Sequence, residues 1–186
     1  LLEREVPVTA SGKKTNRSLY RLADEFLRFW FRFVEPNRSS IEEAPDVVLQ
    51  NTIMPALPQY VSATFEDVCR EAVWAAIRSG RLQGYSDVGR WWYGEDEIDI
   101  VALDPSEDRI VLGECKWTSE PVGYGLVEDL QRKAANVRWG PDSRTETFAL
   151  FSKAGFTDGL AEETDENWEL YSLSDLDSIL SSDNKS

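Results

Sequence analysis

The sequence has no histidine and only two cysteines, and these absences exclude several kinds of site. Without histidine the chain has no Ser-His-Asp or Cys-His catalytic group and no His-ligated zinc. Cys69 and Cys115 form no Cys-X-X-Cys motif, so we expect two small buried hydrophobic residues in a reducing compartment. Gly12 and Lys13 follow Pro7, where a P-loop requires its first glycine, so this stretch is not a Walker A motif.

Long apolar runs are also missing. No segment approaches the roughly 18 apolar residues of a membrane-spanning helix, and no charged-then-apolar leader opens the chain. We therefore expect a soluble, cytoplasmic protein. The chain does not begin with methionine, and its first residues read as the middle of an element, which favours a piece of a longer protein. Its 186 residues, 41% hydrophobic, suffice for one well-packed domain and an appendage.

Lysine is scarce and acidic residues are abundant. The chain has 34 acidic and 20 basic residues, only six of them lysine, with a net charge of −14 and a pI of about 4.4. Such a surface is typical of a halophile protein that its charge keeps soluble in strong salt. An acidic surface for a partner is the alternative, which we rank lower because the acids are spread along the whole chain. The acidity argues against broad nucleic-acid affinity, which depends on neutralising phosphates with lysine and arginine.

The chain divides into four stretches. Residues 1–22 contain two short strands around a polar loop, at Arg4–Val8 and Ser18–Leu22, and look like the wing of a winged helix whose helices lie upstream. Residues 23–58 are an aromatic linker helix and a connector. Residues 59–181 form the main domain, and residues 182–186 a disordered tail.

The linker helix is predicted over Ala23–Val34, with Asp24 as its N-cap. Its aromatic residues recur at the helical spacing i, i+3, i+4 and i+7: Phe26, Phe29, Trp30 and Phe33. Such a stripe usually packs in a core, and base stacking is the alternative. After it we expect a stop at Pro36, a short helix over Ile41–Gln50 and a connector through Pro55 and Pro58.

The main domain has an α/β order. We predict a helix at Gln59–Ser79, a strand at Tyr85–Trp92, a hairpin within Glu95–Trp117, a helix at Val122–Val137, a strand at Thr145–Ser152, a short helix, a strand at Glu169–Leu173 and a Ser174-capped helix at Asp175–Leu180. This order favours a mixed β-sheet flanked by helices.

The hairpin contains the strongest functional signal. Two apolar runs flank the polar turn Pro105–Asp108, and the second run places Glu114 and Lys116 on one face of a strand with Leu112. Asp99 in the first run can reach the same face by hairpin pairing. Two carboxylates can hold Mg2+ or Mn2+, and an ammonium can orient water or stabilise charge, which suits phosphodiester hydrolysis. A structural Glu–Lys or Asp–Lys pair is the alternative.

Several motifs occur in an order that resembles a known family. They are Tyr20–Asn37, Phe65-Glu66, Glu97–Val101, Gly113–Trp117 and Phe151–Phe156. An aspartate followed by Glu-X-Lys resembles the PD-(D/E)XK nuclease superfamily. Together, from Arg4 to about Leu180, the motifs resemble the C-terminal domain of unknown function of archaeal-type AAA-family ATPases, with a restriction-endonuclease-like fold. The resemblance implies an upstream winged helix and an upstream P-loop ATPase. ATP would bind only in that ATPase.

The resemblance also assigns roles to residues. The superfamily positions fall on an acid in the first core helix, a metal-binding aspartate and a Glu-X-Lys: Glu66, Asp99, Glu114 and Lys116. Ile98 stands where the superfamily often has proline. Candidate substrate contacts lie on the helix after the hairpin: Gln131, Arg132, Lys133 and Arg138. Basic residues on a helix are more often a solvated face.

Two alternatives concern the acid on the first core helix. Glu71 can replace Glu66, and Glu66 can be a solvated acid in the first turn, favoured by the helix dipole. With either acid, the chain is predicted to be a Mg2+- or Mn2+-dependent hydrolase of DNA phosphodiesters, with Asp99 and Glu114 on the metal. The second hypothesis is a non-catalytic nucleic-acid-binding or regulatory module of the ATPase. A filled cleft, with Lys116 paired to Glu114 or Asp99, would favour that module.

Overall fold

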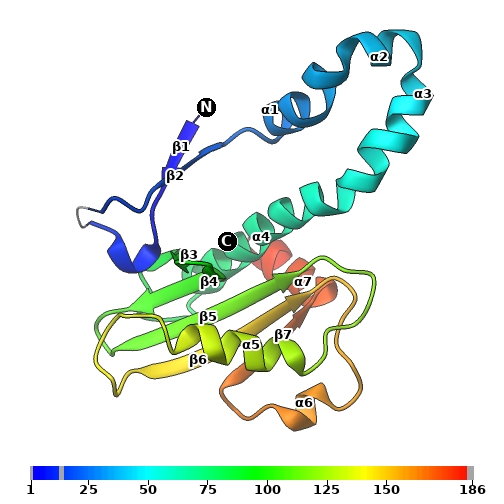
Figure 1. The fold of residues 1–186 in the computed structure, drawn as a ribbon. Helices are drawn as coiled ribbons and strands as arrows, with labels where there is room; N and C mark the ends of the chain where they lie inside the picture. The colour runs from blue at the N-terminus through cyan, green and yellow to red at the C-terminus, as the bar shows by residue number, and fades with distance from the viewer. Residues whose placement is uncertain (1, 13–14, 184–186) are drawn as a thin grey trace.

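The structure, a computed structural model, describes residues 2–12 and 15–183. It consists of a small N-terminal sheet, a helical arm and a five-stranded sheet with helices on both faces (Figure 1). The small sheet pairs β1 (Leu2–Glu5) with antiparallel β2 (Leu19–Leu22). The large sheet has the order β3-β4-β5-β6-β7, with strands at Asp87–Tyr93, Asp96–Asp104, Arg109–Lys116, Thr145–Ser152 and Trp168–Ser172.

The predicted mixed sheet is confirmed. Strands β3, β4 and β5 form an antiparallel meander, whereas β5, β6 and β7 are parallel. A parallel pair requires a crossover, and helix α5 (Gly125–Ala134) lies in the β5–β6 crossover as α6 (Leu160–Glu163) lies in the β6–β7 crossover. Helix α5 begins three residues later than predicted, at Gly125.

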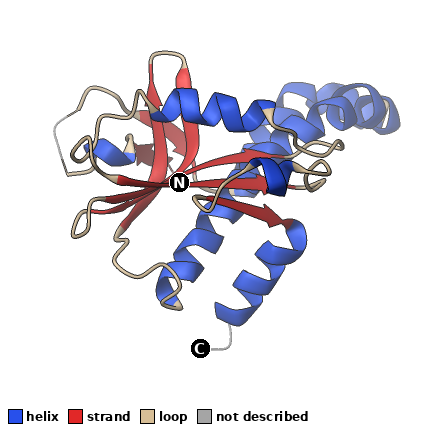
Figure 2. Cartoon of the chain, turned by 90° about the horizontal axis from the view of Figure 1, so that it is seen from below, coloured by secondary structure: helices blue, strands red, loops and turns tan. Residues whose placement is uncertain are grey.

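Helices cover both faces of the large sheet (Figure 2). Helix α5, with the 3-10 turn η1 (Val8–Ala10), lies on one face, and α4 (Met54–Arg78) and α7 (Leu173–Asp183) lie on the other. Along β5, Ile110 and Leu112 pack on the α5 side while Val111 and Cys115 pack on the α4 side. Burial of both faces explains why β5 reads as a continuous apolar run. Cys115 and Cys69 are free and buried, as predicted.

Residues 25–57, here called the helical arm, project from the sheet as a hooked run of short helices that leads into α4 (Figure 1). The run comprises α1 (Glu25–Phe29), π-helix η2 (Trp30–Val34), 3-10 helix η3 (Glu35–Asn37), α2 (Arg38–Glu43), α3 (Pro45–Val48) and π-helix η4 (Leu49–Ile53). Asp24 caps α1 as predicted, because its side chain accepts a hydrogen bond from the Leu27 N–H at 2.9 Å.

Two predictions about the arm are wrong. Pro36 does not end the helical path, since it lies in the first turn of η3, where a missing N–H costs no intrahelical bond. Residues 54–58 are not a connector but the start of α4, with Pro55 in its first turn. The aromatic stripe is core in part: Phe33 is buried and packs with Phe29 against Tyr60, while Phe26 is 67% exposed.

The ends of the chain also differ from prediction. Val8 belongs to η1 and not to the first strand. Ser174 lies inside α7 and is not its cap; instead the Ser172 N–H and hydroxyl donate to Asp175 Oδ2 at 2.8 and 2.6 Å. The predicted tail begins too early, because α7 continues to Asp183. Residues 184–186, and Lys13 and Lys14 of the polar loop, lie outside the described residues.

No helix in residues 2–12 and 15–183 combines the length and the apolarity needed to cross a lipid bilayer.

Candidate active site

A β-bulge in β4 determines where Asp99 lies. Residues 89–91 of β3 face residues 98–101 of β4, so β4 has one extra residue in this interval. Such a bulge bends the strand and redirects a side chain. The pairing of β4 with β5 ends just before Asp99, whose Oδ2 accepts a hydrogen bond from the backbone N–H of Cys115 at 2.9 Å. Asp99 therefore lies where two central strands diverge.

Strand β5 brings Glu114 and Lys116 to the same end of the sheet, as predicted. The Glu114 side chain is only 3% exposed and lies between two ammonium groups. Lys133 Nζ of α5 is 2.7 Å from Glu114 Oε1, and Lys116 Nζ is 3.4 Å from Oε2. The first distance is that of a strong charge-assisted hydrogen bond, and the second is long for one. Lys133 therefore holds Glu114 more firmly than Lys116 does.

Helix α4 supplies the third acid. Because α4 begins at Met54, Glu66 lies in the middle of the helix with its side chain 19% exposed, and is not a solvated first-turn acid. The alternative Glu71 is exposed and pairs with Arg78 at 2.7 Å. Glu66 is thus the α4 acid that faces the sheet.

Arg90 of β3 was not singled out by the sequence, yet it contacts three carboxylates. It forms ion pairs with Glu97, with Glu5 at 3.4 Å and with Glu66 at 4.0 Å. Its Nε is buried and has no hydrogen-bond partner among the described residues. Arg90 stands opposite the bulge, so no sequence motif marks it. It links the N-terminal strand β1 to the candidate site.

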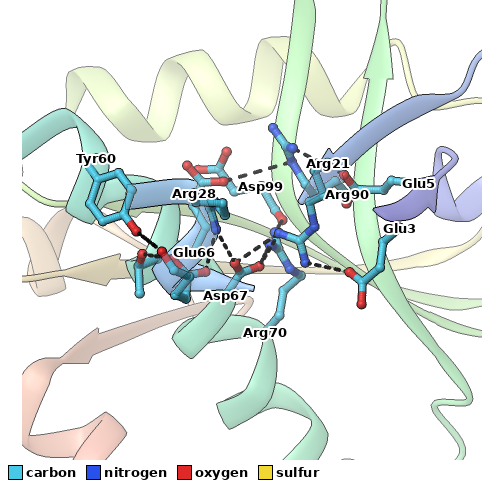
Figure 3. Close-up of polar contacts among 12 residues, drawn as sticks. Glu3, Glu5, Arg21, Arg28, Tyr60, Glu66, Asp67, Arg70, Arg90 and Asp99 are labelled. Carbon is cyan, nitrogen blue, oxygen red and sulfur yellow. Dashed lines mark hydrogen bonds and ion pairs between the residues drawn. The ribbon is translucent and has the colours of Figure 1, made fainter. Parts of the chain in front are cut away.

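A second arginine network surrounds Asp67, the neighbour of Glu66 on α4 (Figure 3). Arg21 of β2 donates to Asp67 at 2.8 and 3.0 Å, Arg28 donates at 3.4 Å, and Arg70 also contacts this carboxylate. Arg70 Nη1 donates in addition to the backbone oxygen of Asp99 at 3.1 Å. The network therefore fixes α4 relative to the bulge and attaches β2 and α1 to both.

Burial and mutual repulsion raise the pKa values of two of the acids. For Glu66, burial first and the charge of Asp99 second raise the pKa to about 7, against the opposing effect of nearby arginines. For Glu114 the same two causes raise the pKa, although Lys133 and Lys116 oppose them. Perturbed acids that converge in this way are typical of functional sites.

Of the predicted substrate contacts, α5 brings only Lys133 to the acids. Burial disfavours its charge, but hydrogen bonds to Glu114 and Asp129 outweigh that effect and raise the Lys133 pKa. Arg132 is instead held by Asp96 and Asp129, each at 2.9 Å. Gln131 is exposed, and its side chain makes no hydrogen bond with another described residue. These two residues are on the solvent side of α5.

The acids differ from a closed metal centre built from protein ligands alone. In the part of the chain that the structure describes, no three His, Cys, Asp or Glu side chains are grouped closely enough to hold a metal ion. Mg2+, however, is often held by one or two carboxylates and several waters. Asp99 and Glu114 supply two carboxylates. Burial first and the charge of Asp99 second raise the Glu114 pKa, and a bound cation would lower it again. Asp99 and Glu114 are the residues that would hold such a cation, in exchange for the lysine contacts of Glu114.

Space for a ligand lies beside Lys116. A surface cavity of about 650 Å³ runs from Lys116 along the loop to the start of α5, lined by residues 116 and 118–126. Lys116 is thus paired with Glu114 on one side and borders open space on the other.

The chain belongs to the DUF234 family, described as "Archaea bacterial proteins of unknown function", whose model matches residues 30–135. That range contains all of the converging acids and both lysines. The chain is also 30% identical over 155 residues to MJECL04, an uncharacterized protein of Methanocaldococcus jannaschii. The match covers 82% of this chain and 34% of the relative, so the chain spans about a third of the length of that curated relative. No solved structure matches the chain significantly.

Proposed function

We propose that this chain is a metal-dependent hydrolase domain for DNA phosphodiesters. The observation that supports it most is the position of Asp99, where the pairing of β4 with β5 ends. Its charge acts on both Glu66 and Glu114, and Glu114 is in turn paired with Lys116. These groups come from three separate elements. The burial of like charges costs stability, which favours a functional reason for their position.

Each residue has a role in this proposal. Asp99 and Glu114 hold Mg2+ or Mn2+, which, when bound, polarises a phosphoryl oxygen and lowers the pKa of a coordinated water. Glu66, with its pKa of about 7, accepts a proton from the attacking water or positions that water. Lys116 borders the open cavity and stabilises the negative charge that develops on the phosphoryl oxygens. Lys133 keeps Glu114 ionised and oriented.

The topology supports assignment to the PD-(D/E)XK superfamily and its restriction-endonuclease-like fold. A helix with an inward acid, an antiparallel hairpin with Asp99 on one strand and Glu114-X-Lys116 on the next, a crossover helix and a parallel strand follow in this order. In this assignment the 59–181 region is the nuclease-like domain. A fold alone does not establish an activity, so the proposal depends on the site.

The length of the relative supports a larger parent protein. Because this chain spans 34% of that relative, we infer a longer chain in which it is the C-terminal part of an AAA-family ATPase. The β1–β2 pair would then be the wing of an upstream winged helix, and ATP would bind only in the ATPase. A cytoplasmic location and DNA as the partner belong to the same proposal.

A second function has one observation in its favour. Both oxygens of Glu114 are engaged by lysines, which offset part of its charge without a metal. In a non-catalytic nucleic-acid-binding or regulatory module, the same groups would be an ion-pair network that holds α5 on the sheet. The 3.4 Å Lys116–Glu114 distance makes this network less complete than a purely structural one.

The test is cleavage of plasmid and branched DNA in Mg2+ or Mn2+ across a salt series, because a chain of net charge −14 binds DNA only if local cations compensate. We expect Asp99→Ala and Lys116→Ala to lower the cleavage rate by at least about 100-fold. Glu71→Ala is the matched control, because Glu71 lies on α4 but outside the site. No cleavage at any salt, with no metal binding by calorimetry, would instead establish the non-catalytic module.

A further inference from the structure

A second cavity, of about 260 Å³, lies at the turn end of the β3–β4 hairpin. Its lining comes from four separate parts of the chain: Thr9, Arg17, Trp91, Tyr93, Asn136 and Arg138. Arg17 is in the loop before β2, Tyr93 ends β3, and Arg138 follows α5. Two guanidinium groups and an aromatic ring thus border one hollow.

These two arginines differ from most cations in this acidic protein. Most described lysines and arginines are bound to a carboxylate. Neither Arg17 nor Arg138 forms an ion pair with another described residue, and Arg138 forms no side-chain hydrogen bond with one either. Two positive charges that no acid of the described residues pairs with therefore border this one cavity. Such charge is available to an anion.

The aromatic ring adds a second recognition element. The Arg17 guanidinium lies over the Tyr93 ring, 5.6 Å from its centroid, and Arg17 Nη1 donates to the Trp92 backbone oxygen at 3.3 Å. These contacts hold Arg17 in place, while Tyr93 remains 63% exposed. An arginine and an open aromatic ring side by side are what single-stranded nucleic acid requires, since bases stack on the ring and phosphates contact the cation.

The cavity is close to the candidate active site. Asp96 pairs with Tyr93 at the hairpin end and is three residues from Asp99, about 10 Å along an extended strand. The end of α5 and the segment that follows it are fixed to the same place, because Arg132 and Asn136 both donate to Asp96 at 2.9 Å. The segment after α5, which contains Arg138, is therefore attached to β4, the strand that contains Asp99.

We propose that this cavity binds a phosphate of the nucleic-acid strand that enters the candidate active site, and that a neighbouring base stacks on Tyr93. The inference rests on the proposed function. It names Arg17, Tyr93 and Arg138 as the residues that hold the strand beside the reacting phosphodiester. It also answers the objection that the net charge raises, since two cations without acidic partners are sufficient to mark a local binding point on an acidic surface.

The experiment measures binding separately from cleavage. Fluorescence anisotropy follows a labelled single-stranded and a labelled duplex oligonucleotide, in EDTA and in an Asp99→Ala background, over a salt series. The test variant is Arg17→Gln/Arg138→Gln, and the control is Arg32→Gln/Arg81→Gln. The control arginines also lack an acidic partner among the described residues, but they contact Gln59 and Ser182 far from the cavity.

We expect the test variant to bind at least about tenfold more weakly than the control, and its salt slope to fall by about 1 for each arginine removed. Tyr93→Ala should weaken single-strand binding by about fivefold or more. The charge-conserving Arg17→Lys/Arg138→Lys variant should retain most of the salt slope. This variant separates loss of a phosphate contact from misfolding.

Two results overturn the inference: equal affinity of the test and control variants, or no measurable binding of either oligonucleotide by the Asp99→Ala parent. Cleavage by the wild type with equal affinity of both double variants would reject this cavity and keep the proposed function. Arginine-dependent binding without any cleavage would keep the cavity and reject the hydrolase. The two proposals therefore fail in distinguishable ways.

Discussion

Each end of the β4–β5 hairpin buries an acidic side chain, Asp104 at the turn and Glu114 at the other end. The pKa values of these two acids are shifted in opposite directions. At the turn end Asp104 is fully buried and accepts hydrogen bonds from Ser106 and Arg109 at distances of 2.5 to 3.0 Å. These hydrogen bonds, that from the Ser106 hydroxyl first, lower the Asp104 pKa. At the other end the pKa values of Glu114 and Glu66 are raised, because burial and Asp99 act together.

The difference separates a structural acid from a candidate functional one. Asp104 has local partners within five residues in sequence, so the turn itself satisfies its charge. The acids at the strand end depend on groups from α4, α5 and β3, and their negative charge remains incompletely balanced. A site that binds a cation or exchanges a proton needs this imbalance, whereas a turn that only joins two strands does not.

The sharpest test of the comparison exchanges an aspartate for asparagine at each end. We expect Asp99→Asn to weaken Mg2+ binding and cleavage by more than about 100-fold, because the proposed metal ligand loses its charge. For the Asp104→Asn molecules that fold, Mg2+ affinity and cleavage rate should stay within a small factor of the wild-type values. Calorimetric titration with Mg2+ measures the difference. If Asp104→Asn does not fold, Ser106→Ala, which removes one donor to Asp104, takes its place.

Stability should show the reverse order. We expect Asp104→Asn to lower the free energy of unfolding more than Glu114→Gln. Asp104→Asn removes the charge that Arg109 pairs with, whereas after Glu114→Gln the Lys133 ammonium keeps Asp129 at 2.9 Å as its partner. The lowered Asp104 pKa stabilises the fold above its unfolded value of 3.8, and this stabilisation is lost as the pH falls further. Urea unfolding at pH 7 and pH 3 measures both. A larger loss in Glu114→Gln would contradict the comparison.

Glu66 should make stability fall as the pH rises. Its pKa is about 7 in the folded chain and 4.5 as its ordinary value, so between these limits the folded state binds more protons. We expect the wild type to lose about 2 kcal/mol between pH 5 and pH 8 from this group. Glu66→Gln should remove that part of the pH dependence, and Glu71→Gln should not. Parallel urea titrations of the three proteins at both pH values decide the matter.

The smallest effect is expected for Lys133. In Lys133→Gln, Glu114 keeps only the weaker contact with Lys116, so its pKa should rise further and Mg2+ should compete with more protons. We expect the Mg2+ affinity to fall by about tenfold or less at pH 7 and to recover at higher pH. Arg132→Gln, on the same helix but outside the site, should have no such pH-dependent effect. An unchanged affinity would remove Lys133 from the site.

Much of the fold was predictable because its signals are local. The alternation along β5 correctly predicts that Glu114 and Lys116 share a face with Leu112, since side chains on a strand alternate with a period of two. The apolar run of β6 predicts its bounds, Thr145–Ser152, without error. The helical arm was less predictable, because its prolines fall in first turns, where a helix tolerates them.

The sequence by itself determined the hairpin, the Glu-X-Lys pair, the mixed order of strands and helices and the family to which the chain belongs. The tertiary structure alone decided the bulge that directs Asp99 and the inward position of Glu66. It also decided that Lys133 and not Arg132 contacts Glu114, and that Arg90 pairs with Glu66. The physical reason is the distance along the chain. Strand periodicity and turn chemistry act between near neighbours, whereas the charges around each acid come from separate elements that only packing brings together.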